Sequence, residues 1–218
     1  FTCFRGADLL ADLADRDFTI NAMALPATAV STTSIIDPFN GLADLAQKQI
    51  RLVRPNALEQ DPIRAFRAVR QALSYGFHLT DDTKTAVIAA APLLHQSSVE
   101  RIRDELVKSL ETAVPHQAIQ QLAELGLLAQ VLPEVAQLAD IEQSPPHHEQ
   151  VLAHTISVLR WLVAVETAVV EQQPAPTPEL SAVQTRLAEF SDGLKMHLSR
   201  EIAGGLNGRL LLRLAGVF

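Results

Sequence analysis

The residues best suited to chemistry form a row of arginines that follows an acidic residue. Arg64, Arg67 and Arg70 recur at every third position after Asp61 and Pro62. Aspartate favours the N-cap of a helix, and proline favours the next position, where no amide donor is needed. On such a helix successive arginines stay adjacent. A carboxylate one turn from a guanidinium suits the hydrogen-bonding edge of a nucleobase, and the further arginines suit phosphate oxygens.

The same residues allow a plainer interpretation. A capping aspartate and three solvated or salt-bridged arginines occur in many proteins, and spacing alone favours that explanation. Apolar residues occupy the neighbouring stripe of this helix, so one side is predicted to pack and the adjoining side to carry positive charge. The stripe consists of Ile63, Phe66, Val69 and Leu73.

A second polar stretch, residues 15–25, contains Arg16 and Asp17. Charged residues there are interleaved with apolar ones without a clean period, so several polar groups must lie close to a core. Buried polar groups need partners, which favours a site or a dense hydrogen-bond network. The alternative is that Arg16 and Asp17 pair with neighbours at a helix end.

A third cluster, residues 144–155, contains His147, His148, Glu149 and His154. Three histidines and a glutamate could ligate a metal. The spacing favours a surface turn with one core-facing histidine, His154, so we predict no metal ligand in this chain.

Composition sets the limits of these interpretations. The chain has 218 residues, of which 48% are hydrophobic, and a net charge of −7. That charge argues against a uniformly basic nucleic-acid coat but allows a local basic face. Residues 51–70 contain five arginines and only two acidic residues, Glu59 and Asp61, which gives a local excess charge of +3. The single cysteine, Cys3, forbids an internal disulfide and is compatible with a reducing cytoplasm.

The pattern of residues predicts a mostly helical chain. The sequence is expected to contain no apolar run long enough to cross a bilayer, and no signal peptide is visible. We therefore predict a cytoplasmic protein without a membrane partner. The absence of a start methionine and an apolar run at the end predict a fragment. Strands are expected at 1–5 and 50–53, a hairpin at 26–36, a turn at 37–41, and helices from Pro62 to Gly76 and at 81–91, 98–110, 115–130, 149–171, 180–194 and 206–218.

Four stretches together resemble the class II tRNA nucleotidyltransferase family, which also contains bacterial poly(A) polymerases. Their order and spacing agree over residues 1–140. Two positions depart from the family pattern: Asp15 stands where many members have a second arginine, and Gln60 replaces a glutamate. The four stretches are Arg16–Ala22, Asp37–Gly41 with Asp44-Leu45, Gln60–Arg70, and Ser98–Ile102 with Glu105-Leu106.

The resemblance implies a nucleotide-binding site. Arg16 would contact the nucleotide, with Asp17 near the ribose. Asp61 and Arg64 would pair with the Watson–Crick edge of the incoming CTP or ATP, as a template made of protein. An acceptor beside a donor can match cytosine or adenine and matches guanine or uracil poorly. The remaining arginines of the row, which would hold phosphates, are Arg67 and Arg70.

The resemblance also implies a fold and a cofactor. The expected class is α+β, mostly α: residues 1–50 as the remnant of a polymerase-β-like head sheet, 51–140 as helical neck and body, and 141–218 as an incomplete HD-like helical domain. The family's first motif holds an Asp-x-Asp pair that binds Mg²⁺. Only fifteen residues precede Arg16, so these ligands are expected upstream of Phe1 and the chain alone is expected to be inactive.

The implied function is addition of CCA, or part of it, to the 3′ end of tRNA from CTP and ATP. Three alternatives remain open. Addition of poly(A) is the alternative within the same class. A non-catalytic RNA-binding module would fit a protein that begins at Phe1, and an HD-type metal phosphohydrolase would need a His-Asp pair after Phe218.

Overall fold

The chain folds into two compact units. The computed structural model describes residues 6–141 and 150–218. One unit consists of Phe1–Glu105 with Glu124–Val131, and the other of Leu106–Ala123 with Leu132–Phe218. The strand predicted at 1–5 and most of the histidine cluster lie outside the described residues. The fold class, α+β and mostly α, is confirmed; the division at residues 50 and 140 stays a prediction.

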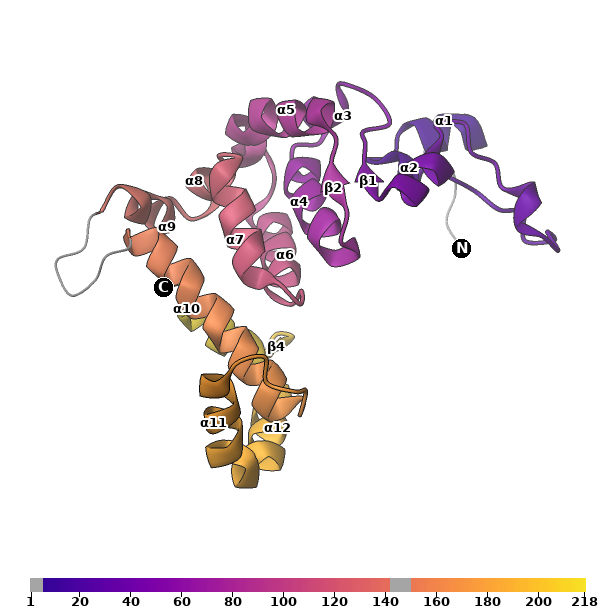
Figure 1. The fold of residues 1–218 in the computed structure, drawn as a ribbon. Coiled ribbons are helices and arrows are strands. Elements are labelled where there is room, and N and C mark those ends of the chain that lie inside the picture. The colour runs from indigo at the N-terminus through magenta and orange to yellow at the C-terminus, as the bar shows by residue number, and fades with distance from the viewer. Residues whose placement is uncertain (1–5, 142–149) are drawn as a thin grey trace. The chain divides into compact units, whose positions relative to one another are not determined.

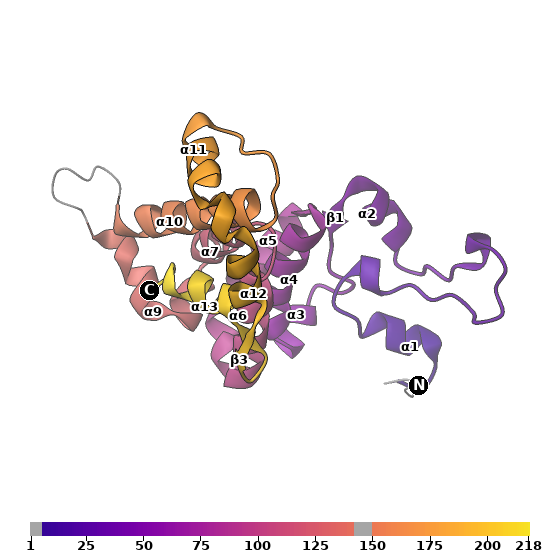
Figure 2. The same ribbon diagram turned by 90° about the horizontal axis from the view of Figure 1, so that it is seen from below.

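The first unit begins with short elements. Helix α1 (Leu9–Ala14) is capped by Asp8, whose side chain accepts from the Ala11 amide at 2.8 Å. A 3-10 turn (η1, Thr19–Asn21) follows. The hairpin predicted at 26–36 is reduced to one antiparallel bridge, in which Ala24 and Ile36 exchange both backbone hydrogen bonds. Figures 1 and 2 show the segment between them reaching away from α2.

The predicted turn at 37–41 is present and starts helix α2 (Gly41–Gln47). Asn40 adopts the left-handed conformation (φ 60°), and Asp37 accepts from the amides of Gly41 and Leu42. Gly41 is required at the helix start because a Cβ there would lie 2.3 Å from the Thr19 carbonyl oxygen. This close approach places α2 directly against η1.

Helix α4 (Ile63–Tyr75) forms the core of the first unit. Ile63, Phe66 and Val69 are fully buried, as the predicted apolar stripe requires, and Gly76 ends the helix with φ 66°. The remaining elements of the unit surround it. They are β1 (Gln49–Ile50), α3 (Ala57–Gln60), β2 (His78–Leu79) parallel to β1, α5 (Asp81–Ala90), the 3-10 helix η3 (Ala91–Gln96) and α8 (Leu128–Val131).

Helix α6 (Val99–Leu110) begins in the first unit and ends in the second. In the residues that the structure describes, the second unit is helical apart from one short antiparallel pair. Its elements are α7 (Pro115–Glu124), α9 (Pro133–Ala136), the 3-10 helix η4 (Gln137–Asp140), α10 (Val151–Val165), a π-helical turn (η5, Glu166–Val170), α11 (Pro178–Leu187), η6 (Ala188–Phe190), α12 (Ser191–Ser199), β3 (Glu201–Ala203), β4 (Leu206–Asn207) and α13 (Gly208–Ala215).

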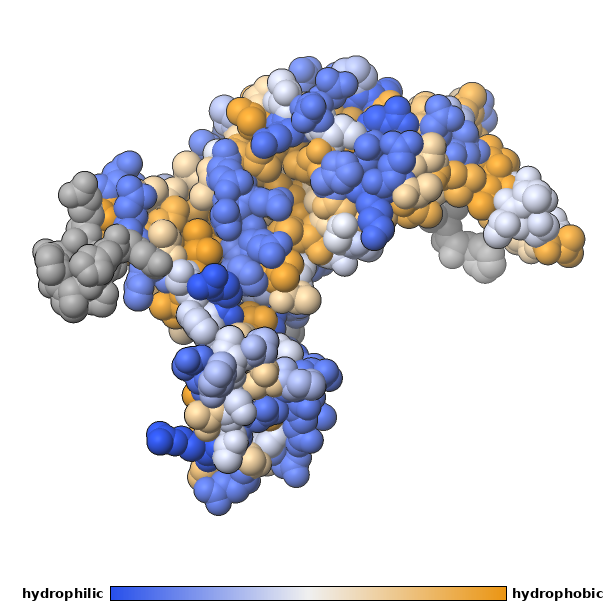
Figure 3. Space-filling model, in the orientation of Figure 1, coloured by the Kyte–Doolittle hydropathy of each residue, from blue (hydrophilic) through white to orange (hydrophobic). Residues whose placement is uncertain are grey.

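A buried ion pair holds the second unit together. Arg213 of α13 donates to Glu166 at 2.7 Å and to the main-chain oxygens of Leu110 and Thr112 at 2.6 and 3.1 Å. The carbonyls at the end of α6 are thereby satisfied by a side chain distant in the sequence. Figure 3 shows a largely hydrophilic surface over α11 and α12 of this unit.

The prediction that no apolar run could cross a bilayer is corrected for Val151–Val170. This stretch is long and apolar enough by length and composition, and 33% of its most apolar window is buried. A core helix of a soluble protein meets the same criterion. Helix α10 contacts α11 and η4 within its own unit.

Candidate functional site

Asp17 connects residues 15–25, called the head segment below, to α4. It is buried, and Oδ1 accepts from its neighbour's amide, Phe18 N, at 2.9 Å and from Asn21 Nδ2 at 2.9 Å. Oδ2 accepts from Arg67 Nη1 at 3.0 Å. Backbone pairing with residues 51–53 holds this segment in place. The contact with Arg67 crosses fifty residues of sequence, so Asp17 belongs to a tertiary network rather than to a local helix-end pair.

Arg16 lies beside this network and makes a local pair. Its Nη2 and Nε donate to Asp12 Oδ2 at 2.7 and 3.3 Å. Asp12 is buried, whereas the Arg16 side chain is 42% exposed. The local pairing considered from the sequence is therefore present for Arg16, and the exposed side chain remains accessible to a ligand.

A buried glutamate outside the predicted set orients two arginines of α4. Glu105 of α6 accepts from Arg70 Nε at 2.6 Å and lies 3.5 Å from Arg67 Nε. Burial lowers the pKa of Arg67, but the hydrogen bond and charge of Asp17, together with the charges of Glu105 and Asp61, outweigh this effect and raise it overall. Arg67 therefore carries a fixed positive charge.

Asp61 does not cap α4 through its side chain, which corrects the sequence prediction. Helix α4 has no side-chain cap, and the Asp61 carboxylate instead accepts from Arg101 Nη1 and Nη2 at 2.9 Å each. A guanidinium fork satisfies both carboxylate oxygens at once, which a single backbone amide does not. The nearest atom of Arg64 to this carboxylate is Nε, at 3.6 Å.

Arg64 is the most buried arginine of the row. Its Nη2 donates to the main-chain oxygen of Asp15 at 2.7 Å, and Nη1 donates to that of Ala57 at 3.4 Å. The guanidinium thus braces the head segment against the start of α4. Its predicted contact with a base stays a prediction and would need one of these donors to be released.

The structure gathers all six predicted residues into the first unit. Direct contacts join Asp17 to Arg67 and bring Asp61 near Arg64. Arg67 and Arg70 share Glu105, and Arg16 neighbours the main-chain contact at Asp15. The residues that pair with these side chains lie outside the predicted set. They are Arg101 and Glu105, which stand in the fourth quoted motif, and Gln71, which accepts from Asn21 Nδ2 at 3.0 Å.

Asp44 gives the second quoted motif, Asp37–Gly41 with Asp44-Leu45, a structural role. Its Oδ2 accepts from the Thr19 hydroxyl and from Arg51 Nε at 2.8 Å. Asp44 is buried, so this oxygen ties α2 to the head segment and to the connector after β1. The motif therefore positions the stretch that carries Arg16 and Asp17.

The carboxylates of the site do not form a metal site. No group of three or more histidine, cysteine, aspartate or glutamate residues that could hold a metal occurs in residues 6–141 and 150–218. Asp17 and Asp61 each face a guanidinium, which is a poor environment for Mg²⁺. These residues therefore do not fit the implied magnesium site.

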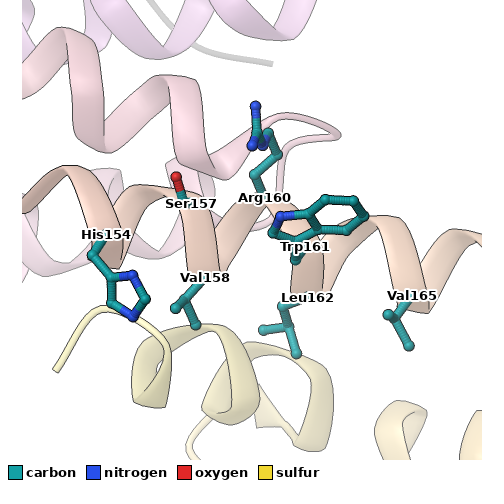
Figure 4. Close-up of a pocket in the computed structure, with 7 residues that line it drawn as sticks. All are labelled: His154, Ser157, Val158, Arg160, Trp161, Leu162 and Val165. Atoms are coloured by element: carbon teal, nitrogen blue, oxygen red, sulfur yellow. The ribbon is translucent and has the colours of Figure 1, made fainter. Parts of the chain in front are cut away.

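His154 lies apart from the arginine network, in the second unit. It lines a pocket of about 510 Å³ along α10, whose wall also includes Trp161. Figure 4 shows the His154 ring pointing toward the C-terminal segment, with Val158 and Leu162 on the same side. The pocket is mainly apolar, and no cluster of metal ligands is found at His154 in the part of the chain that the structure describes.

Two segments of the chain match known protein families. Residues 4–51 match the family "Poly A polymerase head domain", and residues 76–138 match "Probable RNA and SrmB- binding site of polymerase A". The "Multifunctional CCA protein" of Halorhodospira halophila (strain DSM 244 / SL1) is 38% identical over 164 residues, which cover 72% of this chain and 38% of that protein. The "CC-adding tRNA nucleotidyltransferase" of Geobacter sulfurreducens (strain ATCC 51573 / DSM 12127 / PCA) is 41% identical over 116 residues, covering 53% of this chain and 26% of that one.

A solved structure agrees with these matches. "The complex structure of CCA-adding enzyme with ATP" superposes with a TM-score of 0.57 at 26% identity, over 85% of this chain and 41% of that chain. The matched segments define the class of the chain: residues 4–51 are similar to poly(A) polymerase head domains, and residues 76–138 are similar to a helical segment that follows the head in such proteins. The chain belongs to the tRNA nucleotidyltransferase and poly(A) polymerase family. It spans less than half the length of the curated relatives described above.

Proposed function

We propose that the protein carrying this chain adds CCA, or part of it, to the 3′ end of tRNA, with CTP and ATP as substrates. The observation that supports this most is the cluster at the start of α4. There the Asp61 carboxylate is oriented by Arg101 and lies next to Arg64. Relatives named for CCA addition and for CC addition support the same assignment.

In this proposal the described residues bind and orient the nucleotide. Asp61 accepts a hydrogen bond from the exocyclic amine that cytosine and adenine both carry, and Arg64 donates to the ring edge beside it. Arg16 contacts the nucleotide and Asp17 lies near its ribose. The guanidinium groups that hold the phosphates are those of Arg67 and Arg70.

Other features of the whole protein are proposals of the same kind. Magnesium is proposed as its cofactor, although no described residue is assigned to hold it. The protein is proposed to be cytoplasmic, and residues 141–218 to be the start of an HD-like domain. None of these three features is needed for the proposed selection of the nucleotide by Asp61 and Arg64.

The test is nucleotide incorporation by the full-length protein. The substrate is tRNA that lacks its CCA end, and each labelled nucleotide is supplied in turn with magnesium. We expect two C and one A to be added and the reaction to stop there. Addition of CC alone or A alone would indicate a divided pathway, which the CC-adding relative makes a specific alternative. Unlimited addition of A would indicate a poly(A) polymerase.

Absence of incorporation would contradict the proposal. The same preparation would then be tested for tRNA binding and for metal-dependent hydrolysis of a phosphate ester. Binding without incorporation would support a non-catalytic RNA-binding protein, and hydrolysis would support the HD-type phosphohydrolase.

A further inference from the structure

We propose that Arg54 is a further nucleotide-binding residue, whose guanidinium binds a phosphate of the incoming nucleotide in place of the Asp15 carboxylate. Arg54 belongs to none of the quoted motifs. The inference rests on the proposed function and extends its set of phosphate-binding residues.

Arg54 contacts two segments of the proposed site. It lies in the connector between β1 and α3, and its Nη2 donates to Asp15 Oδ1 at 2.8 Å and to Gln60 Oε1 at 3.4 Å. Asp15 directly precedes Arg16, and Gln60 directly precedes Asp61. The guanidinium therefore lies between the two segments that carry the predicted nucleotide-binding residues.

The Arg54 guanidinium also has a hydrogen-bond donor that no acceptor in the described part of the chain satisfies. Arg54 Nε is buried and has no hydrogen-bond partner among the described residues. Arg16 and Arg101, by comparison, each engage two nitrogens with a carboxylate. A buried donor without an acceptor is unfavourable. A phosphate that takes the place of Asp15, with a small rotation of the guanidinium, would supply an acceptor to Nε.

The ion pair between Arg54 and Asp15 is accessible to solvent. The side chains of Arg54 and Asp15 are 37% and 43% exposed, whereas those of Asp17 and Glu105 are 8% and 5% exposed. An ion pair between exposed groups is weak because water screens it. A phosphate group offers three acceptor oxygens to the guanidinium fork. Asp15 is therefore the carboxylate of this network that a phosphate displaces most readily.

The test uses steady-state incorporation by the full-length protein on tRNA without its CCA end, with CTP or ATP varied. Arg54→Met should raise the KM for both nucleotides by about tenfold, the effect of losing one charge-assisted interaction. Because both nucleotides carry the same phosphates, the preference for CTP over UTP should not change. Asp15→Asn should lower both KM values by about threefold, because it removes the competing charge.

The double variant makes the inference specific. Asp15→Asn with Arg54→Met should behave like Arg54→Met alone, because Asp15 acts only through Arg54. If the Arg54–Asp15 pair served only to join the two segments, Asp15→Asn should instead raise the KM for both nucleotides. That result, an unchanged KM in Arg54→Met, or a change in nucleotide preference would overturn the proposal.

Controls come from an exposed pair on α6. Arg103 pairs with Asp104 at 3.0 Å outside the site, with 66% and 54% of the side chains exposed. Arg103→Met and Asp104→Asn should leave both KM values unchanged. If the unaltered protein incorporates nucleotides and Arg54→Met has unchanged KM values for CTP and ATP, only this inference fails. If the unaltered protein incorporates none, the proposed function fails and this inference fails with it.

Discussion

Arg101 donates to both carboxylate oxygens of Asp61, each at 2.9 Å. The two residues are forty positions apart, on α6 and just before α4. A two-point contact fixes the plane of a carboxylate, whereas each oxygen keeps a second lone pair for a further donor. The Asp61 side chain is 25% exposed, so this lone pair is accessible. Arg101 therefore orients the group that is proposed to recognise the base.

Replacing Arg101 should weaken nucleotide selection. Arg101→Met leaves the Asp61 carboxylate free to rotate, and we expect the preference for CTP over UTP to fall about tenfold, the effect of one misplaced charged hydrogen bond. The measurement is kcat/KM for each nucleotide. Arg103→Met on the same helix is the control. If the KM for CTP falls and the preference for CTP over UTP does not change, Arg101 instead blocks the access of the base to Asp61.

Removing Asp61 and Arg64 together should abolish the preference for CTP over UTP in the full-length protein. The base then meets neither the acceptor nor the donor proposed to select it. Magnesium binding should remain intact. Arg64 also braces Asp15 and Ala57, so a thermal melt must establish that the variant is folded. Unchanged nucleotide choice in a folded variant would contradict the templating role.

Glu105→Gln should destabilise the first unit. The change removes the negative charge that Arg70 and Arg67 share at a buried position. Losing one partner of a buried ion pair costs about 3–5 kcal/mol, and the partial exposure of these arginines reduces our expectation to about 2 kcal/mol. Urea unfolding measures the loss. Asp104→Asn, an exposed change on the same helix, should stay within about 0.5 kcal/mol.

Gly41→Ala should destabilise the head segment by about 2–3 kcal/mol, because the new Cβ would lie 2.3 Å from the Thr19 carbonyl oxygen. Gly193→Ala in α12 is the matched control. Nothing lies within 4 Å of a Cβ at Gly193, so alanine should stabilise that helix by up to about 1 kcal/mol. Equal effects of the two changes in a urea titration would contradict the packing of α2 on η1.

His116 should make stability sensitive to acid. Burial, followed by the nearby charge of Arg160, lowers the pKa of His116 below its ordinary value of 6.5. The unfolded chain therefore binds a proton at a higher pH than the folded chain does. The stabilisation is complete above pH 6.5 and is lost as the pH falls through the folded pKa. The urea midpoints of unfolding measured above and below pH 6.5 should lie closer together in His116→Gln than in the unaltered protein. If His116→Gln keeps the full difference between the two midpoints, the assignment to His116 is contradicted.

Local sequence rules predicted much of the first unit. The helix predicted at 81–91 is present as α5, and Gly76 ends α4 with a positive φ where the predicted helix ends. The apolar stripe of α4 is buried because helical periodicity places Ile63, Phe66 and Val69 on one side. The hairpin at 26–36 was predicted less well, because one bridge between Ala24 and Ile36 replaces a ladder.

The sequence by itself determined the family, the helical class and the position of the arginine row, since spacing along a helix fixes which residues are neighbours. Only the tertiary structure decided the partner of each charge. Asp61 could have capped its own helix, but α6 brings Arg101 to it across forty residues. Glu105 reaches Arg70 across thirty-five residues for the same reason. Such pairings depend on how helices pack against one another, and the residue types at one position do not encode that packing.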